Sequence, residues 1–507
     1  MSGTQRGVLS IDEGSTGTRA AVVTADGASG PSFYQPIAVL HPDPLRVEQD
    51  ADELWRRTLD VARQAVRWAG DNAVEITGVA LCTQRATAVL WDRETGRPLA
   101  PAVVWQDRRY AAELAELAAE WDPVQLARTG RPVGTRSPFF WAARQIEQNP
   151  QVAAAAADGR LLFGPIDTWL SWNLNGGTRH GVATSNAAAL GGYLLREHRW
   201  DAEWLAAVGC PAQLAPALVD DDGDFGWTDP DVLGVRVPIA AAMGDQHASL
   251  IALGALEAGQ GMCMHGTGTF VGALTGDEPA DAATATAGVL ALPGWRSGGR
   301  TRFSLEAYTS TTGSALRWLV EDLQLFDSAE QVGELAGRQP RERETWFVPT
   351  LAGLRTPVAE PGARASLTGL SLATTRAGIA RAVLEGIAHS VCDTVDGVRA
   401  AMPAGHELTR LRVGGGLAAS DALLQSQADL AGVAIERAAD SATASLRGVA
   451  YLAGVRLGLW DSLDEALHAL PAGRAFEPAI GEDERQELRA QWGRVLRKSL
   501  PEEGTTC

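Results

Sequence analysis

The chain has 507 residues, of which 45% are hydrophobic and 21% charged, and its formal net charge at pH 7 is −18. This length exceeds the roughly 100–200 residues that one domain usually contains, so it predicts at least two large domains. The acidic balance argues against nucleic acids and anionic membranes as partners, because both require a positive surface field.

Cysteine usage and hydropathy favour a cytoplasmic protein. The five cysteines are scattered along the chain, are odd in number and show no CxxC spacing, as is typical of a reducing compartment. The first residues lack the apolar stretch of a signal peptide, and no apolar run reaches the roughly 18 residues of a membrane span. A homodimer or a higher homo-oligomer stays open, because nothing in the sequence decides the assembly.

The first element pair is a predicted hairpin with a polar, glycine-bearing tip. Residues 8–11 and 20–23 are apolar and rich in valine, which predicts two short strands. Gly14 and Gly17 permit close backbone approach, and the tip adds hydroxyl groups and the fixed charge of Arg19, which together suit phosphate. Asp12 could hold Mg²⁺ through water. An ordinary tight turn is an equal alternative at this point.

A helix and a strand should follow this hairpin. Asp50 could cap a helix with apolar residues near one face, and residues 76–81 have the composition of a strand. The hairpin pattern then recurs, since residues 261–265 and 270–274 flank the tip Gly266–Thr269. A single tip of this kind is weak evidence for a phosphate site, but a pair of tips on two domains strengthens it.

The carboxy-terminal half alternates helix and strand. Thr375 precedes a periodic apolar helix over residues 376–399, and residues 411–413 form a strand that enters three consecutive glycines. This alternation predicts an α/β architecture. Residues 220–224 and 276–300 are expected to form surface loops. The domain boundary is expected near residues 247–260, which gives an amino-terminal domain over 1–250 and a carboxy-terminal domain over 251–507.

Five collinear motifs, DEGSTGTR, TQRATAVLWDRETGRPLAPAVVWQDRR, GDQHA, HGTGT and VLEGIA, resemble the FGGY carbohydrate kinases. The resemblance runs from about Val8 to Trp460 and is strongest to the glycerol kinase branch of that family. It implies a two-domain, actin-like and hexokinase-like ATPase fold of the ribonuclease H-like class, with a central cleft. ATP with Mg²⁺ and a small polyol or sugar would meet in this cleft, and the nucleotide would be bound mainly by the second domain.

The resemblance also assigns roles to individual residues. Asp245 is similar to the general base that takes the proton of the substrate hydroxyl, and the substrate would contact Gln84, Arg85, Trp105, Asp245 and Gln246. Nucleotide contacts carry over to Ser15, Thr16, Gly17, Arg19, Thr267, Gly313, Arg317, Gly416 and Ser420. Two of these depart from the pattern, because Arg317 stands in place of Gln and Ser420 in place of Asn. Both changes make adenine specificity less secure than phosphate binding.

The predicted substrate pocket departs further from the glycerol kinase pattern. Ala86 replaces a Glu that would bind polyol hydroxyls, and Val133 falls at the position of a substrate-binding Tyr. An unpaired buried hydroxyl costs roughly 1–3 kcal/mol, so glycerol should bind weakly. A ketose, a longer polyol or a cyclitol is the alternative acceptor. A non-catalytic ATP-binding sensor of the same fold is a second alternative, since fold alone does not decide function.

Overall fold

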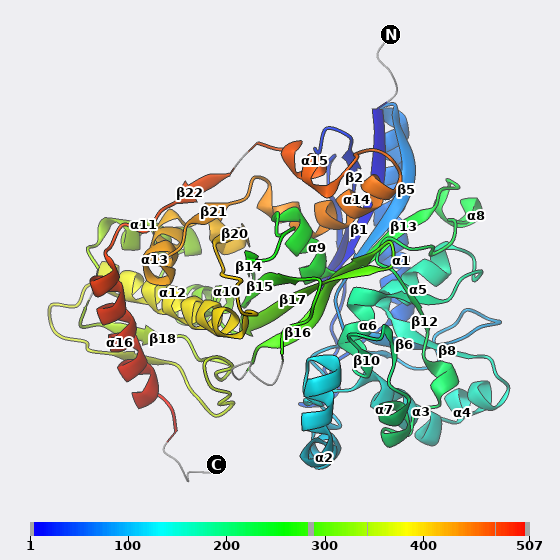
Figure 1. Cartoon of the computed structure of the whole chain (residues 1–507), viewed down its shortest axis with the longest axis horizontal. Coiled ribbons are helices and arrows are strands. Elements are labelled where there is room, and N and C mark those ends of the chain that lie inside the picture. Colours follow the sequence, from blue (N-terminus) through cyan, green and yellow to red (C-terminus); the bar gives the residue numbers. More distant parts are fainter. Residues whose placement is uncertain (1–4, 282–287, 342, 472, 502–507) are drawn as a thin grey trace.

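The computed structural model describes residues 5–281, 288–341, 343–471 and 473–501. Two large sheets lie at the centres of two halves of the molecule (Figure 1). The amino-terminal half, drawn in blue to green, lies on the right of Figure 1, and most of the carboxy-terminal half lies on the left. The α/β architecture predicted from the alternating pattern is confirmed, whereas the division at residue 250 stays a prediction.

The amino-terminal sheet carries the first hairpin. In spatial order its strands are β13 (Ile239–Gly244), β5 (Val74–Thr83), β1 (Gln5–Glu13), β2 (Gly17–Thr24) and β3 (Phe33–Pro36). β1 pairs with β2 in an antiparallel ladder, while β5 runs parallel to both β1 and β13. Because parallel strands end at one edge of a sheet, β1, β5 and β13 deliver Asp12, Gln84 and Asp245 to the same edge.

Helix α1 (Ala51–Asp71) covers this sheet and begins as the sequence predicts. The Asp50 side chain accepts hydrogen bonds from the backbone N–H groups of Asp52 and Glu53, which satisfies two donors that the helix leaves open. Leu54, Val61 and Ala65 are buried in the core that α1 shares with the sheet.

The carboxy-terminal sheet carries the second predicted hairpin. In spatial order its strands are β16 (Leu290–Ser297), β17 (Arg300–Thr309), β15 (Thr269–Gly276), β14 (Gln260–His265), β20 (Arg410–Gly415), β21 (Ile435–Arg437) and β22 (Arg474–Phe476). β14 and β15 form the hairpin, and β20 runs parallel to β14. The same local device therefore occurs once in each half.

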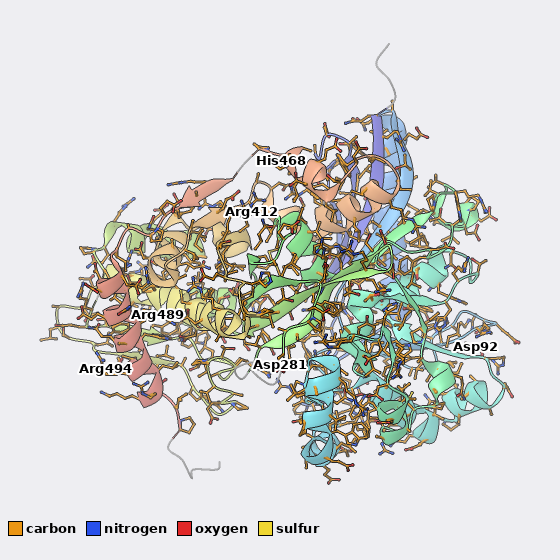
Figure 2. The ribbon with its side chains drawn as sticks, viewed as in Figure 1. Asp92, Asp281, Arg412, His468, Arg489 and Arg494 are labelled. Atoms are coloured by element: carbon orange, nitrogen blue, oxygen red, sulfur yellow. The ribbon has the colours of Figure 1, made fainter. Side chains whose placement is uncertain are left out.

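The carboxy-terminal half also contains helices. They are α10 (Gly313–Arg317), α11 (Ala329–Arg338), α12 (Arg376–Ala401), α13 (Asp421–Ala431), α14 (Ala444–Arg456), α15 (Leu463–His468) and α16 (Glu482–Lys498). α12 begins where the sequence predicts, since Thr375 Oγ1 accepts from Gly378 N–H. Arg489 of α16, labelled in Figure 2, ties α16 to α12 by donating to Asp393 at 2.6 Å and to Asp396 at 2.9 Å.

The prediction that residues 220–224 and 276–300 are surface loops is wrong in two places. Asp221 is fully buried and accepts from the N–H and hydroxyl of Ser185 and from Arg296 N–H, since a buried carboxylate requires such partners. Residues 290–297 form β16, whose apolar side chains are largely buried. Residues 282–287 lie outside the described residues.

Smaller elements complete the amino-terminal half. A second sheet contains β4 (Glu48–Gln49), β7 (Ala102–Val103), β6 (Ala88–Asp92) and β8 (Leu161–Pro165). The helices are α2 (Ala111–Thr129), α3 (Pro138–Gln148), α4 (Pro150–Ala157), α5 (Ile166–Leu174), α6 (Thr184–Leu190), α7 (Ala202–Ala207), α8 (Pro230–Leu233) and α9 (Asp245–Ala252).

Helices α9 and α14 join the two halves. They cross so closely that a Cβ atom on Gly448 would lie 1.7 Å from the backbone oxygen of Ala248. α14 also contacts the amino-terminal sheet, because Ser10 Oγ donates to Leu446 O at 2.7 Å. Figure 1 shows orange α14 beside blue β1 and β5. One apolar cluster accordingly takes members from both halves, among them Val8, Ala80, Ala248 and Val449.

Two further observations concern the chain as a whole. Cys82, Cys210, Cys263 and Cys392 are free and buried, and Cys507 lies outside the described residues. Among the helices that the structure describes, none has both the length and the hydropathy needed to cross a lipid bilayer.

Candidate active site

A cavity of about 150 Å³ lies between the two large sheets. The amino-terminal half lines it with Ser15, Gln84, Arg85, Trp105, Arg131, Arg136, Ser185, Ala189, Asp245 and His247, and the carboxy-terminal half with Phe270, Leu290, Leu292, Glu306 and Tyr308. Four of the predicted substrate-contacting residues, Gln84, Arg85, Trp105 and Asp245, thus come together on one surface. The first hairpin reaches the same cavity through Ser15.

Asp245 stands at the start of α9, directly after β13 ends. Its side chain is 35% exposed and lines the cavity, so a ligand can reach the carboxylate. Oδ1 accepts from Gln246 N–H at 2.8 Å and lies 3.4 Å from Arg85 Nε. Burial raises the pKa of Asp245, and the Arg85 charge opposes that shift. A carboxylate with a raised pKa is a stronger base than an ordinary aspartate.

Arg85 links Asp245 to a second carboxylate. Its guanidinium lies 2.9 Å from Glu306 Oε2, so one buried cation bridges a residue of the first half and a residue of β17. Arg85 also approaches His247 Nε2 at 3.4 Å, and His247 Nδ1 lies 3.1 Å from Gly294 O. Burial and Arg85 hold the pKa of His247 well below its usual value, so this histidine is neutral. It lies between Arg85 and Gly294 and adds no charge to the cavity wall.

The tip of the first hairpin is fixed by side chains that line the cavity. Trp105 Nε1 donates to Ser15 Oγ at 2.7 Å. The Gln84 amide donates to Gln49 Oε1 at 2.9 Å and accepts from Thr87 Oγ1 at 2.9 Å. Gln49 Nε2 in turn donates to Ser15 O at 2.7 Å, so Gln84 supports the tip through Gln49. A Cβ atom on Gly17 would lie 2.4 Å from the Tyr34 hydroxyl oxygen, so the exposed Tyr34 side chain would have to move.

Asp12 has one engaged and one available carboxylate oxygen. Oδ2 accepts from Arg19 Nε at 2.9 Å and from Ser445 Oγ at 2.7 Å, and no bond of Oδ1 occurs within the described residues. Arg19 further donates to Ala442 O at 2.9 Å, so its charge is shared between the tip and the second half. One free oxygen fits a Mg²⁺ ion that keeps several waters and takes its other ligands from phosphate.

The tip of the second hairpin packs on the start of α10. Gly313 N–H donates to Gly266 O at 3.2 Å, and Ser314 Oγ donates to Thr267 O at 3.0 Å. A Cβ atom at position 313 would lie 2.4 Å from Gly266 O, which explains the glycine. Thr267 is exposed at the tip beside Gly313, whereas the Arg317 side chain is exposed at the far end of the short helix. Thr16, at the first tip, is exposed as well.

Gly416 and Ser420 lie in a different cavity, of about 570 Å³, between α11, α12 and α13. Ser420 caps α13 through its hydroxyl, which accepts from Leu423 N–H at 3.3 Å. A Cβ atom on Gly333 of α11 would lie 3.1 Å from Ser420 Oγ, so a glycine at this position leaves room beside the Ser420 hydroxyl in the cavity. Leu316 of α10 also lines this cavity, whereas its neighbour Arg317 does not, and the role of Arg317 toward a nucleotide stays a prediction.

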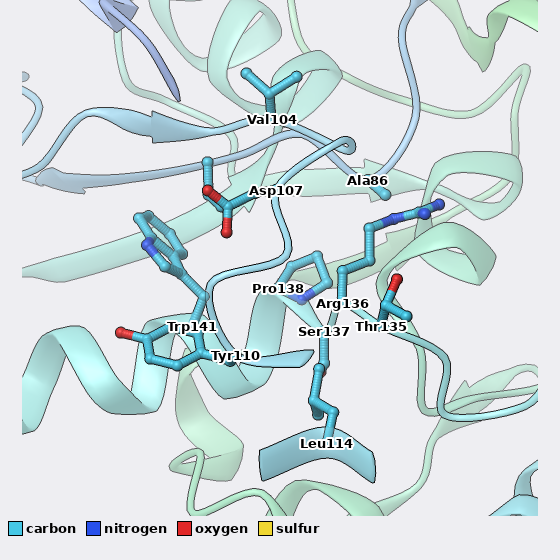
Figure 3. A pocket seen from close by; sticks show the side chains of 11 residues that line it. Ala86, Val104, Asp107, Tyr110, Leu114, Thr135, Arg136, Ser137, Pro138 and Trp141 are labelled. Carbon is cyan, nitrogen blue, oxygen red and sulfur yellow. The ribbon is translucent and has the colours of Figure 1, made fainter. Parts of the chain in front are cut away.

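Two substitutions highlighted in the sequence have different surroundings from those expected. Val133 packs in an apolar core and does not line the main cavity. Ala86 has φ of 62° and borders a separate hollow of about 20 Å³ that it shares with Arg136. In Figure 3 the Arg136 side chain points toward Ala86. Gln246 is turned back on Asp245 and does not line the main cavity.

Several residues at the cavity are missed by sequence reasoning. Glu306 is one charged side chain in the buried strand β17, and this position in an apolar run is the signal that could have revealed it. Phe270 and Tyr308 stack at a centroid distance of 5.2 Å and form one wall. Arg131 and Arg136 come from an irregular segment whose sequence carries no comparable signal.

Glu13 follows Asp12 at the end of β1, and its buried carboxyl group should make the stability of the protein depend on pH. It is fully buried, receives a hydrogen bond from Thr58 Oγ1 at 2.5 Å, and its Oε1 has no partner within the described residues. Burial raises the pKa of Glu13 from 4.5 to about 8. The folded state therefore binds more protons than the unfolded state between these values, and stability falls as pH rises through them.

Replacing Glu13 by Gln should remove this contribution. We expect the melting temperature of the wild type to decline between about pH 5 and pH 8 more steeply than that of the variant. Thermal unfolding of both proteins across this interval measures the difference. Parallel curves would show that Glu13 is not protonated in the folded protein.

Models of the FGGY family of carbohydrate kinases match most of the chain. The model of its N-terminal domain matches residues 7–252 and that of its C-terminal domain matches residues 261–457. A glycerol kinase of Dechloromonas aromatica is 38% identical over 501 residues, which cover 97% of each chain. A glycerol kinase of Halorhodospira halophila is 36% identical and covers 98% of this chain and 97% of its own.

Solved structures share the architecture. A Plasmodium falciparum glycerol kinase, solved with ADP, superposes with a TM-score of 0.91 at 25% identity and covers 98% of this chain and 99% of its own. A xylulose kinase of Rhodospirillum rubrum superposes with a TM-score of 0.82 at 22% identity, with 97% and 99% covered. The second likeness concerns the fold alone.

Proposed function

Since the chain belongs to the FGGY family of carbohydrate kinases, we propose that it transfers the γ-phosphoryl group of ATP to a hydroxyl group of a small polyol or sugar. The observation that carries this proposal is the Asp245 carboxylate, which lines the cavity between the two sheets and has a raised pKa. Such a group accepts a proton from a hydroxyl more readily than an ordinary aspartate does.

In the proposed reaction the substrate hydroxyl donates its proton to Asp245 as its oxygen attacks the γ-phosphorus. The new O–P bond forms while the bond from phosphorus to the bridging oxygen breaks, and ADP leaves with that electron pair. Arg85 holds Asp245 in place from one side and Glu306 fixes Arg85 from the other. Bound substrates that fill the cavity would displace water from the γ-phosphate, and this favours transfer to the substrate over hydrolysis of ATP.

The nucleotide would extend from the hairpin tips to the larger cavity. Ser15, Thr16, Gly17 and Arg19 of the first tip and Thr267 of the second offer hydroxyl, backbone and guanidinium donors to the phosphates. Gly416 and Ser420 would lie against the adenosine, supported by the volume of about 570 Å³ at that place. Asp12 would hold Mg²⁺ through water, and the ion would neutralise negative charge on the transferring group. Arg317 would act only at the periphery.

A coupled assay of ADP release tests this proposal. The purified chain is given ATP and Mg²⁺ with glycerol, tetritols, pentitols, ketoses, cyclitols and hydroxy acids, one at a time. We expect at least one acceptor to raise the rate of ADP release well above the rate with ATP alone. Uniform rates across the panel would instead favour a nucleotide-binding sensor of the same fold, which needs no acceptor.

The free buried cysteines support a cytoplasmic setting for the enzyme.

A further inference from the structure

The charges on the cavity wall do not balance. Three guanidinium groups, of Arg85, Arg131 and Arg136, line the cavity with two carboxylates, of Asp245 and Glu306. Both carboxylates contact Arg85, whose single positive charge offsets one of their two negative charges. Within the described residues, Arg131 and Arg136 form no ion pair, and His247 contributes no charge. The wall therefore carries one net positive charge, and neither Arg131 nor Arg136 has a carboxylate in contact among the described residues.

The surroundings of Arg131 and Arg136 are those of desolvated cations. Arg131 donates to Ala188 O at 2.9 Å, and this neutral carbonyl is the partner of its NH1 group. Arg136 lies over the Trp105 ring with its guanidinium carbon 6.0 Å from the ring centre, and its Nε is buried without a partner. Burial, with Arg136 and Arg85 nearby, lowers the pKa of Arg131 to about 9, and burial lowers the pKa of Arg136 as well.

An unpaired buried cation is costly, and proteins usually keep one only where a ligand compensates it. The two guanidiniums converge on one cavity from positions five residues apart, and Tyr308 adds a phenol to the same wall. Arginine presents parallel N–H donors that match the two oxygens of a carboxylate.

We propose that the acceptor is a hydroxy acid, a polyol chain with a carboxylate at one end, and that Arg131 and Arg136 bind this carboxylate. The reacting hydroxyl at the other end of the chain lies at Asp245. This inference rests on the proposed kinase function and specifies its substrate class. Ala86 belongs to the same arrangement, since its small side chain leaves the hollow into which Arg136 extends.

The test compares matched acceptors that differ only at one terminal carbon: glycerol with glycerate, erythritol with erythronate, and ribitol with ribonate. With the full-length chain, ATP and Mg²⁺, we expect one of the acids to exceed its polyol in kcat/KM by at least about tenfold, because the polyol leaves buried donors unpaired. Arg136→Gln and Arg131→Gln should each lower this acid-to-polyol ratio by roughly 10- to 100-fold. Arg144→Gln is the matched control, because Arg144 lies on α3 outside the cavity and pairs with Glu147.

Each outcome bears on one of the two proposals. If the polyol matches or exceeds its acid in all three pairs, the carboxylate site is overturned while the kinase function stays intact, and preference for a phosphorylated polyol over the acid would have the same meaning. If no acceptor raises ADP release, the proposed kinase function is contradicted. Binding of the acids to the carboxylate site is then tested separately, by the shift in melting temperature that each acceptor causes without ATP. There we expect the acids, and not the polyols, to raise the melting temperature, and equal shifts would contradict the inference. The wild-type comparisons remain decisive if an arginine variant does not fold.

Discussion

Replacing Asp245 by Asn should lower kcat by about 10²–10⁴-fold, the range that a positioned general base usually contributes. Asparagine has nearly the same shape and can keep the contact with Gln246 N–H, but it cannot take a proton from the substrate hydroxyl. Nucleotide affinity should stay within about threefold of the wild type, because the mutation removes an interaction with the acceptor and not with ATP. Steady-state ADP release and titration with an ATP analogue measure the two quantities.

Glu306→Gln is the matched control for this variant. It removes the other carboxylate on Arg85, so the arginine loses one ionic partner while the proposed base remains. If Asp245 acted only by holding Arg85, the two variants would lose activity equally, and this result would rule out the assignment of Asp245 as base. We expect a much smaller loss for Glu306→Gln.

The pH profile offers a second distinction between these variants. Because burial raises the pKa of Asp245, the acid limb of kcat/KM should lie above the pKa of an ordinary aspartate. The negative charge of Glu306 contributes to this raised pKa, so Glu306→Gln should move the acid limb to lower pH. A limb that does not move would mean that another group controls the profile.

Replacing Gly448 by Ala should destabilise the protein by about 3 kcal/mol or more, because overpacking against a rigid backbone is hard to relieve. The added Cβ would lie 1.7 Å from Ala248 O and 2.5 Å from Ala248 C, and neither atom belongs to a flexible side chain. Helices α9 and α14 would have to separate. The midpoint of urea unfolding measures the effect, and variant protein that stays folded should also lose activity because α9 begins with Asp245.

Gly70→Ala is the control for Gly448→Ala. Gly70 also lies within a helix, α1, and nothing is within 4 Å of a Cβ atom built there. Alanine in an open helical position stabilises by about 0.5–1 kcal/mol relative to glycine. An equal loss of stability in both variants would mean that the cost arises from general helix effects and not from the crossing.

Local patterns in the sequence predict much of the fold and the first part of the site. Short apolar runs and glycine-bearing tips identify both hairpins, and the caps Asp50 and Thr375 locate the starts of α1 and α12. Asp245 is found through its motif, and the structure brings it to the cavity with Arg85. These features depend on residues close together in the chain, which is why they can be read in advance.

The remainder of the site depends on contacts between distant segments. Glu306 reaches Arg85 only because β17 of one half lies against the other half, and the chain separates these residues by 221 positions. Arg136 lies in an irregular loop, where no periodicity tells which side chains point inward. Asp221 resembles the solvated acid of a surface loop until β16 and α6 bury it. Charge balance in the cavity is therefore a property of the assembled structure.

The helix α14 that follows β21 in the chain packs against strands from the first quarter of the sequence. A fragment that ends near residue 250 would expose the face of β1, β5 and β13 that α14 covers, and a fragment that starts there would carry α14 with its apolar face uncovered. Exposed faces of this kind promote aggregation. The two halves, which separate family models match, should therefore be produced as one polypeptide or co-expressed. If the chain is divided into two fragments, they must reassemble so that α9 and α14 pack against each other again.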